Sequence, residues 1–375
     1  MTCPPLEEIA VPRHAFVLFA LLCLAVPPAR AAEPPAGPPP LTASEAAPGV
    51  WLFRTEPYGD AGLDGNSVAI VTSEGVLMLD ANGTPAAARA VLAKLRTITK
   101  QPVRWLVLSH WHWDHWYGAE VYRDSFPGLQ IVAHERTRAL MDGPVQAFNR
   151  DGLESQLPGH LHAVESRRDT ATGERRARLA AHAERDRFFL EQKRAVRRTL
   201  PNVTFTDSLT IFAGGREIRV LHVDRAITPG DAFVWLPREG VLATGDLLID
   251  PLTFALFCHP DGWIRTLQYL AALDARVIVP GHGAPMHDER RLAATLELLQ
   301  LEREIAHGAR RGGVPRAAVA GMVMAEPRVL ALRDQLTGGD HTLDEDFATY
   351  LVEWFATRAW DEAGGPLGDA IPTAP

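Results

Sequence analysis

Cysteine is scarce in this chain, which has only Cys3, Cys23 and Cys258 among its 375 residues. We expect the first two to be removed with a signal peptide, which leaves Cys258 alone. A lone cysteine excludes an intramolecular disulfide in the mature chain and a zinc site built from paired cysteines. Any metal site must therefore be built from histidine and carboxylate ligands.

An excess of basic charge is also missing, and the sequence shows no repeat of fixed short period. The chain has 38 Lys and Arg against 46 Asp and Glu, a formal net charge of −8, which does not favour nucleic acid or an anionic membrane surface as a partner. With 46% hydrophobic and 22% charged residues, the composition is that of a globular protein with a sizeable core. We expect the partner to be a small-molecule substrate.

One long apolar run lies near the N-terminus, from Ala15 to Val26, and an Ala-x-Ala sequence ends at Ala31. The run has about 12 residues, which is too short to span a bilayer comfortably. This pattern predicts a signal peptide over residues 1–31, cleaved after Ala31, and the alternative is an uncleaved N-terminal anchor. Residues 32–48 are rich in proline and predict a linker. We therefore expect a periplasmic or secreted protein with no stable membrane span after cleavage.

The region from residue 49 to residue 290 alternates strand-like and helix-like segments, which indicates an α/β fold. Short apolar strands begin at Val50, a helix rich in alanine and leucine covers 86–99, and a continuous apolar run at 103–109 predicts a buried strand. We expect these elements to form one domain over residues 49–290.

Two stretches break this alternation. Residues 145–200 are strongly charged, with Phe188 and Phe189 among many Lys and Arg side chains, and they predict a helical insertion. The insertion is either a solvated helix pair or a lid over the active site that gives the two phenylalanines a place to pack. Beyond residue 290, leucine and aromatic stripes predict a C-terminal helical extension over 291–375.

The strongest chemical signal is the run His110-Trp-His112-Trp-Asp114-His115, which directly follows the buried strand. In an extended backbone alternate residues point the same way, so we expect His110, His112 and Asp114 to converge while His115 turns to a second point nearby. Nitrogen and oxygen ligands at this density suit one or two zinc ions, and iron or manganese would also fit. A single histidine is usually structural, but four metal-capable side chains in this run predict a metal site.

Asp246 and His282 each follow an apolar strand further along the chain. An aspartate after a glycine is often only a turn residue, and a histidine in a glycine loop is often only exposed. Their shared placement at strand ends makes both residues candidate metal ligands, because loops converge at that edge of α/β proteins. A bound metal lowers the pKa of water toward about 7, and a carboxylate such as Asp114 orients the attacking water or accepts its proton. The sequence therefore predicts metal-assisted hydrolysis, with Asp114 as the candidate catalytic residue.

These motifs resemble the metallo-β-lactamase superfamily, whose defining motif is His-x-His-x-Asp-His. The order of the later motifs also matches: Thr228-Pro-Gly-Asp231, then Gly245-Asp246, then Gly281-His282-Gly283. The resemblance covers roughly residues 49–290 and implies a four-layer αββα sandwich with two metal sites. One site would use His110 and His112, and the other would use Asp114, His115 and His282. Asp246 would bridge the two ions.

One position departs from this pattern, because the family usually has a histidine where this chain has Ile227. Isoleucine cannot ligate a metal. We therefore expect one tightly held ion at Asp114, His115, Asp246 and His282, with the other site weak or empty. His222 and His259 are possible substitutes for the missing ligand, but a surface or supporting role is favoured for each.

With an aspartate at position 246, the chain resembles thioester, lactone and phosphodiester hydrolases, whereas the main zinc β-lactamases have Cys or Ser at this position. We predict an exported hydrolase of an ester, thioester, lactone or amide. One alternative is a degenerate member that binds metal or ligand without turnover, and a second is a redox member similar to sulfur dioxygenases. Trp111 and Trp113 are expected to pack beneath the metal loop rather than to line a substrate pocket.

Overall fold

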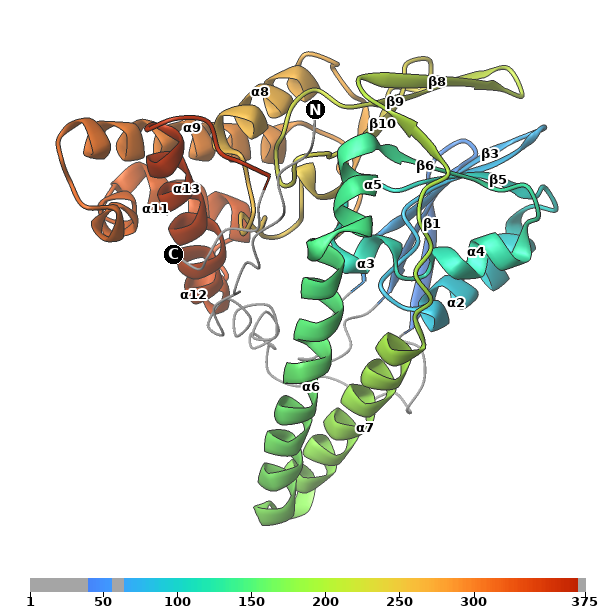
Figure 1. The fold of residues 1–375 in the computed structure, drawn as a ribbon, viewed down its shortest axis with the longest axis horizontal. Coiled ribbons are helices and arrows are strands. Elements are labelled where there is room, and N and C mark those ends of the chain that lie inside the picture. Colours follow the sequence, from blue (N-terminus) through green and yellow to red (C-terminus); the bar gives the residue numbers. More distant parts are fainter. Residues whose placement is uncertain (1–39, 56–63, 370–375) are drawn as a thin grey trace, which may run out of the picture.

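The structure is a computed structural model that describes residues 40–55 and 64–369. The predicted signal peptide, residues 1–31, lies outside the described residues. Two β-sheets and their covering helices form the body, and a long helical hairpin projects from it (Figure 1). Within the described ranges, no helix combines the length and apolarity needed to cross a bilayer.

The first sheet has seven strands in sequence order. Its first four strands are antiparallel neighbours, and β4 to β7 run parallel. The strands are β1 Leu41–Ala47, β2 Val50–Thr55, β3 Ser67–Thr72, β4 Gly75–Leu79, β5 Val103–Val107, β6 Gln130–His134 and β7 Val203–Phe205.

The second sheet has five strands in the order β12-β11-β10-β9-β8, and only β11 and β12 pair in parallel. The strands are β8 Ser208–Ala213, β9 Arg216–Leu221, β10 Phe233–Leu236, β11 Val241–Ala243 and β12 Val277–Val279.

The two sheets pack face to face because their strands alternate side chains between two cores. In β10, Val234 and Leu236 join the core between the sheets, whereas Phe233 and Trp235 belong to the second core, which includes the helices. The first sheet divides its residues in the same way, with Leu77 in one core and Met78 in the other. This arrangement is the predicted four-layer αββα sandwich.

Helices cover the outer faces of both sheets. Helix α2, Pro85–Ile98, starts at Thr84, whose side chain accepts a hydrogen bond from the backbone N–H of Ala87, and it buries its apolar face. Helix α4, Ala119–Ser125, lies beside α2, and helix α8, Pro260–Ala271, belongs to the second half of the sandwich.

The hairpin consists of α6, Pro144–Thr170, and α7, Gly173–Ala195, and follows the short helix α5, Glu135–Asp142. It falls in the stretch predicted to be a helical insertion. Most of it projects from the body, but the last turns of α7 reach the sandwich, where Phe189 is fully buried and its ring lies 5.6 Å from that of Trp113. The base of the hairpin therefore packs against the histidine-rich loop.

The C-terminal helices gather beside α8 (Figure 1). Arg358 donates from Nε to the carbonyl of Cys258 at 2.8 Å, and the rings of Phe355 and Trp263 lie 6.0 Å apart, so this region shares the core of the sandwich. Its elements are α9 Arg290–Arg311, η2 Arg316–Ala318, α10 Val319–Met324, α11 Pro327–Thr337, η3 His341–Leu343, α12 Asp344–Asp346, the π-helix η4 Phe347–Glu353 and α13 Trp354–Glu362.

The linker predicted for residues 32–48 was placed too far along the chain. Residues Leu41–Ala47 form β1, which pairs with β2 in antiparallel register. The strand was hard to recognise because it lies at the edge of the sheet and is only partly buried, so it has no strong apolar alternation.

Candidate metal centre

The candidate ligands lie in loops at the carboxyl ends of three strands. His110 and His112 follow β5, Asp246 lies in the short helix η1, Gly245–Leu247, after β11, and His282 follows β12. Asp114 and His115 lie in the short helix α3, Trp113–Trp116, so the predicted extended alternation through Asp114 was wrong. The chain turns into a helix directly after His112, and this turn brings His115 to the centre of the site.

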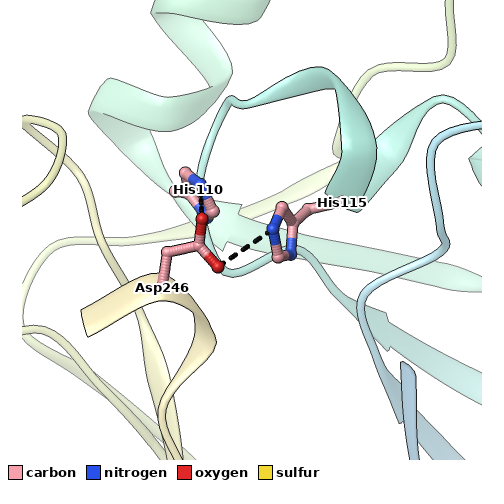
Figure 2. Close-up of side chains that lie close together, drawn as sticks. All are labelled: His110, His115 and Asp246. Atoms are coloured by element: carbon pink, nitrogen blue, oxygen red, sulfur yellow. Dashed lines mark ion pairs between the residues drawn. The ribbon is translucent and has the colours of Figure 1, made fainter. Parts of the chain in front are cut away.

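One group of side chains consists of His110, His115 and Asp246, each buried (Figure 2). Nε2 of His110 lies 3.5 Å from Oδ2 of Asp246, and Nε2 of His115 lies 3.1 Å from Oδ1 of the same carboxylate. The carboxylate therefore faces one imidazole with each oxygen.

A second group consists of Asp114, His115 and His282. Oδ2 of Asp114 lies 3.1 Å from Nε2 of His282 and 3.4 Å from Nε2 of His115. Nε2 of His282 is also 3.5 Å from Oδ1 of Asp246. The two groups thus share His115 and meet at Asp246.

His112 lies at the edge of this cluster and belongs to neither group of three in the part of the chain that the structure describes. Its ring centre lies 4.5 Å from that of His110 and 5.8 Å from that of Phe257. Burial and the neighbouring His110 lower the pKa of His112 to about 3, so its imidazole is neutral and can bind a metal.

The charges of the cluster favour a bound cation. Burial opposes ionisation of Asp246, but the charges of His115 and His282 outweigh it and hold the pKa of this carboxyl well below its usual range. Burial likewise disfavours charged His282, yet Asp246 and the hydrogen bond to Asp114 raise its pKa to about 9. Without a metal, protons on the histidines supply the positive charge that these buried carboxylates need.

The residues fit a divalent metal ion by their unsatisfied atoms as well as by their chemistry. Nε2 of His110, Nε2 of His115 and Oδ1 of Asp246 are buried and have no hydrogen-bond partner among the described residues. Buried polar atoms normally have partners, and imidazole nitrogen with carboxylate oxygen is a donor set that zinc accepts.

Asp80 fixes the orientation of two of these histidines, a role that the sequence analysis missed. Its carboxylate accepts hydrogen bonds from the backbone N–H and the hydroxyl of Ser109, both at 2.7 Å, and from Nδ1 of His115 at 2.8 Å. Because the Ser109 proton goes to Asp80, the Ser109 oxygen accepts from Nδ1 of His110 at 2.9 Å. Both imidazoles therefore carry a proton on Nδ1 and present Nε2 to the site. An acidic residue directly after the apolar strand β4 was the available signal.

The side chain of Asn66 and the glycine at position 281 hold the His282 loop in place. The side-chain amide of Asn66 donates to the carbonyls of Pro280 at 2.8 Å and Gly283 at 3.0 Å. A Cβ atom on Gly281 would lie 2.1 Å from Oδ1 of Asp246, so this position needs glycine for a close approach.

Ile227 is buried in the hydrophobic core. The two histidines considered as its substitutes lie elsewhere, since neither His222 nor His259 joins a potential metal-binding group in the described residues. Nδ1 of His222 is hydrogen-bonded to the carbonyl of Asp231 at 2.8 Å, and its ring stacks 4.0 Å from that of His134. His259 is buried at the start of α8, and burial lowers its pKa to about 3.

Trp111 and Trp113 are both buried and pack beneath the loop, as expected. Lys193 of α7 packs over the ring of Trp113, with its Nζ 3.0 Å from the centre of the indole. Burial lowers the pKa of Lys193 well below its usual range, although the charges of Asp114 and Asp64 oppose this. The hairpin therefore places a buried amine close to the metal-binding loop.

Comparisons with known proteins identify the family of this chain. Residues 60–282 match the family described as the metallo-beta-lactamase superfamily. The chain is 26% identical over 246 residues to a linear primary-alkylsulfatase from a Pseudomonas strain, a match that covers 61% of this chain and 43% of that protein. It is also 26% identical over 169 residues to a metallo-beta-lactamase type 2 from Bacteroides fragilis, covering 41% of this chain and 67% of that protein.

A solved structure shows the same fold. A metallo-beta-lactamase from Pontibacter korlensis matches with a TM-score of 0.50 and 22% identity, covering 70% of this chain and 99% of that one. At this identity the likeness concerns the fold alone. The chain spans less than half the length of the alkylsulfatase, but the family match extends over most of the sandwich and every candidate ligand. This chain belongs to the metallo-β-lactamase superfamily.

Proposed function

We propose that this chain is an exported metal-dependent hydrolase that cleaves an ester, thioester, lactone or amide and holds zinc at Asp114, His115, Asp246 and His282. The observation that carries the proposal is the convergence of these side chains, with ligand atoms 3.1 to 3.5 Å apart, at one buried point of the sandwich. A zinc ion bound there supplies an acidified water and polarises the scissile group.

The side chains of this site have separable roles. Asp80 and Ser109 hold His110 and His115 with Nε2 toward the site. Asp114 is ionised, because the charges of His115 and His282, whose Nε2 atoms lie 3.4 and 3.1 Å from Oδ2, outweigh burial and hold its pKa below the usual range. A carboxylate of this kind accepts a hydrogen bond from the attacking water and orients it, whereas it retains a proton poorly at neutral pH.

Among these substrates we propose esters, and sulfate esters of primary alcohols in particular, as the class to test first. Support comes from the 26% identity over 246 residues to a linear primary-alkylsulfatase. Thioesters, lactones and amides are the other members of the proposed class.

The test is a hydrolysis panel with purified, zinc-loaded protein: a primary alkyl sulfate, a lactone, a thioester and nitrocefin. We expect turnover of the alkyl sulfate that is lost on chelation and in Asp246→Asn, but kept in the exposed control Asp124→Asn. Turnover of nitrocefin alone would contradict sulfate esters as the substrate. Amino-terminal sequencing of the exported protein tests the proposed cleavage after Ala31.

A second candidate is a member that binds metal or ligand without turnover. The buried Ile227 favours it, because this side chain removes one ligand from the site of His110 and His112. Stoichiometric zinc without turnover of any panel substrate would support this candidate over the hydrolase.

A further inference from the structure

The projecting hairpin carries a layer of polar side chains at its centre. His160 comes from α6, and His182 and Asp186 come from α7, one helical turn apart. Asp186 is only 2% exposed, and the side chains of His160 and His182 are 21% and 12% exposed. A carboxylate and two imidazoles therefore meet in the seam between two helices, where apolar side chains would ordinarily pack.

The surrounding positions show that this is a core layer and not a surface pair. On α7, Ala183 and Phe189 are fully buried on the same side as Asp186, and on α6 Val164 is fully buried one turn beyond His160. Placing a carboxylate among such neighbours is costly unless it is neutralised by a cation.

The distances suit three ligands of one ion. Nε2 of His160 lies 3.5 Å from Oδ2 of Asp186, and Nε2 of His182 lies 3.5 Å from Oδ1. One ligand atom from each of the three residues lies within 4.8 Å of the others. A zinc ion with bonds of about 2.0–2.1 Å separates the ligands of a tetrahedron by about 3.3 Å, whereas a charge-assisted hydrogen bond would draw nitrogen and oxygen to about 2.7–2.9 Å.

We propose that His160, His182 and Asp186 form a second metal site that binds a divalent transition-metal ion such as zinc. This site is separate from the candidate metal centre at the strand ends, around His115 and Asp246, which we call the strand-end centre. The three side chains supply two imidazole nitrogens and a carboxylate, and water completes the coordination. Both histidines are neutral when they bind, so the ion replaces protons as the partner of the Asp186 carboxylate.

The position of this site gives it a structural consequence. Pro158 lies inside α6 two residues before His160, where it removes a helical hydrogen bond. An ion between the helices would hold α6 to α7 at this weakened point. Lys193 lies seven residues beyond Asp186, about 10 Å further along α7, so the ion would also stabilise the segment that packs against Trp113.

Zinc content of untagged, full-length protein tests the proposal. We expect His182→Gln to hold one equivalent less than the wild type after dialysis, because glutamine removes the imidazole ligand. His162→Gln is the matched control, since His162 lies on α6 in an exposed position and should leave the zinc content unchanged. Equal zinc in wild type and His182→Gln would overturn the proposal and leave a metal-free ion pair in the hairpin.

A second variant locates the ion even if His182→Gln folds poorly. In cobalt-loaded Asp186→Cys, a thiolate at this position should add a near-ultraviolet sulfur-to-cobalt charge-transfer band that the wild type lacks, because zinc-type sites accept cysteine sulfur. A folded Asp186→Cys protein without that band would refute the site. This readout does not involve the strand-end ligands, so it is independent of the proposed hydrolase activity.

Discussion

Replacing Asp80 by asparagine tests how the strand-end centre is oriented. The substitution keeps the shape of the side chain but removes the carboxylate that accepts three hydrogen bonds, two from Ser109 at 2.7 Å and one from Nδ1 of His115 at 2.8 Å. An asparagine oxygen in the place of Oδ2 would keep the bonds from the Ser109 hydroxyl and from His115, but its NH₂ group would then face the backbone N–H of Ser109. In the opposite orientation the NH₂ group would face the Ser109 hydroxyl and Nδ1 of His115 as a donor. We expect zinc to bind about 10- to 100-fold more weakly, or about 1.4–2.7 kcal/mol, which is typical when the partner of a ligating histidine is lost.

The assay is competition for zinc with a chromophoric chelator, in a His182→Gln background so that only the strand-end centre contributes. Asp274→Asn is a matched control, because Asp274 shares the positive φ of Asp80, 51° against 63°, but is exposed. If Asp80→Asn bound zinc as tightly as Asp274→Asn, the carboxylate would not be what holds His110 and His115.

Three further predictions concern other parts of the molecule. Ile227→His should raise the zinc stoichiometry of the strand-end centre. In the presence of a chelator the same variant should be about 1–3 kcal/mol less stable, because its buried imidazole then has no ion. Unchanged stoichiometry would contradict the view that Ile227 disables a ligand position. Gly281→Ala should lose zinc from a folded protein, because its Cβ would lie 2.1 Å from Oδ1 of Asp246, whereas Gly321→Ala meets no atom within 4 Å and should keep it. Burial raises the pKa of Glu302 from 4.5 to about 8, so between these pH values the native state holds a proton that the unfolded state releases. As the pH rises through this range, Glu302 should therefore lower the free energy of unfolding by up to about 1.4 kcal/mol per pH unit. Urea denaturation across this range should show a flatter pH dependence in Glu302→Gln, and identical slopes would count against a protonated Glu302.

Most of the strand-end centre could be predicted from the sequence, because its ligands directly follow apolar runs. The run from His110 to His115 comes after β5, and Asp246 and His282 come after β11 and β12. Strand ends are recognisable by hydrophobicity alone, and their convergence follows from the layered fold. The path of the backbone between the ligands could not be predicted, since nothing in the residues after His112 marks the turn into α3.

Contacts made over long sequence distances were the part that the sequence could not supply. The pairing of His160 with Asp186 depends on how two helices face each other, and a pattern within either helix does not fix this. The role of Asp80 likewise depends on β4 and β5 lying side by side. Strand β1 was missed because an edge strand with one half-buried face has little periodicity.

The amide of Asn66 has a consequence for how the protein folds. It joins a residue at the start of β3 to a loop that follows β12, across 214 positions of the chain. Such a contact forms only after the halves of the sandwich have docked, since closing a loop of this length is entropically unfavourable until many other contacts compensate for it. An ion captured early by the run from His110 to His115 would meet only part of its ligands. Full affinity would arrive with the last docking step, so the rate of zinc uptake would report on the completion of folding.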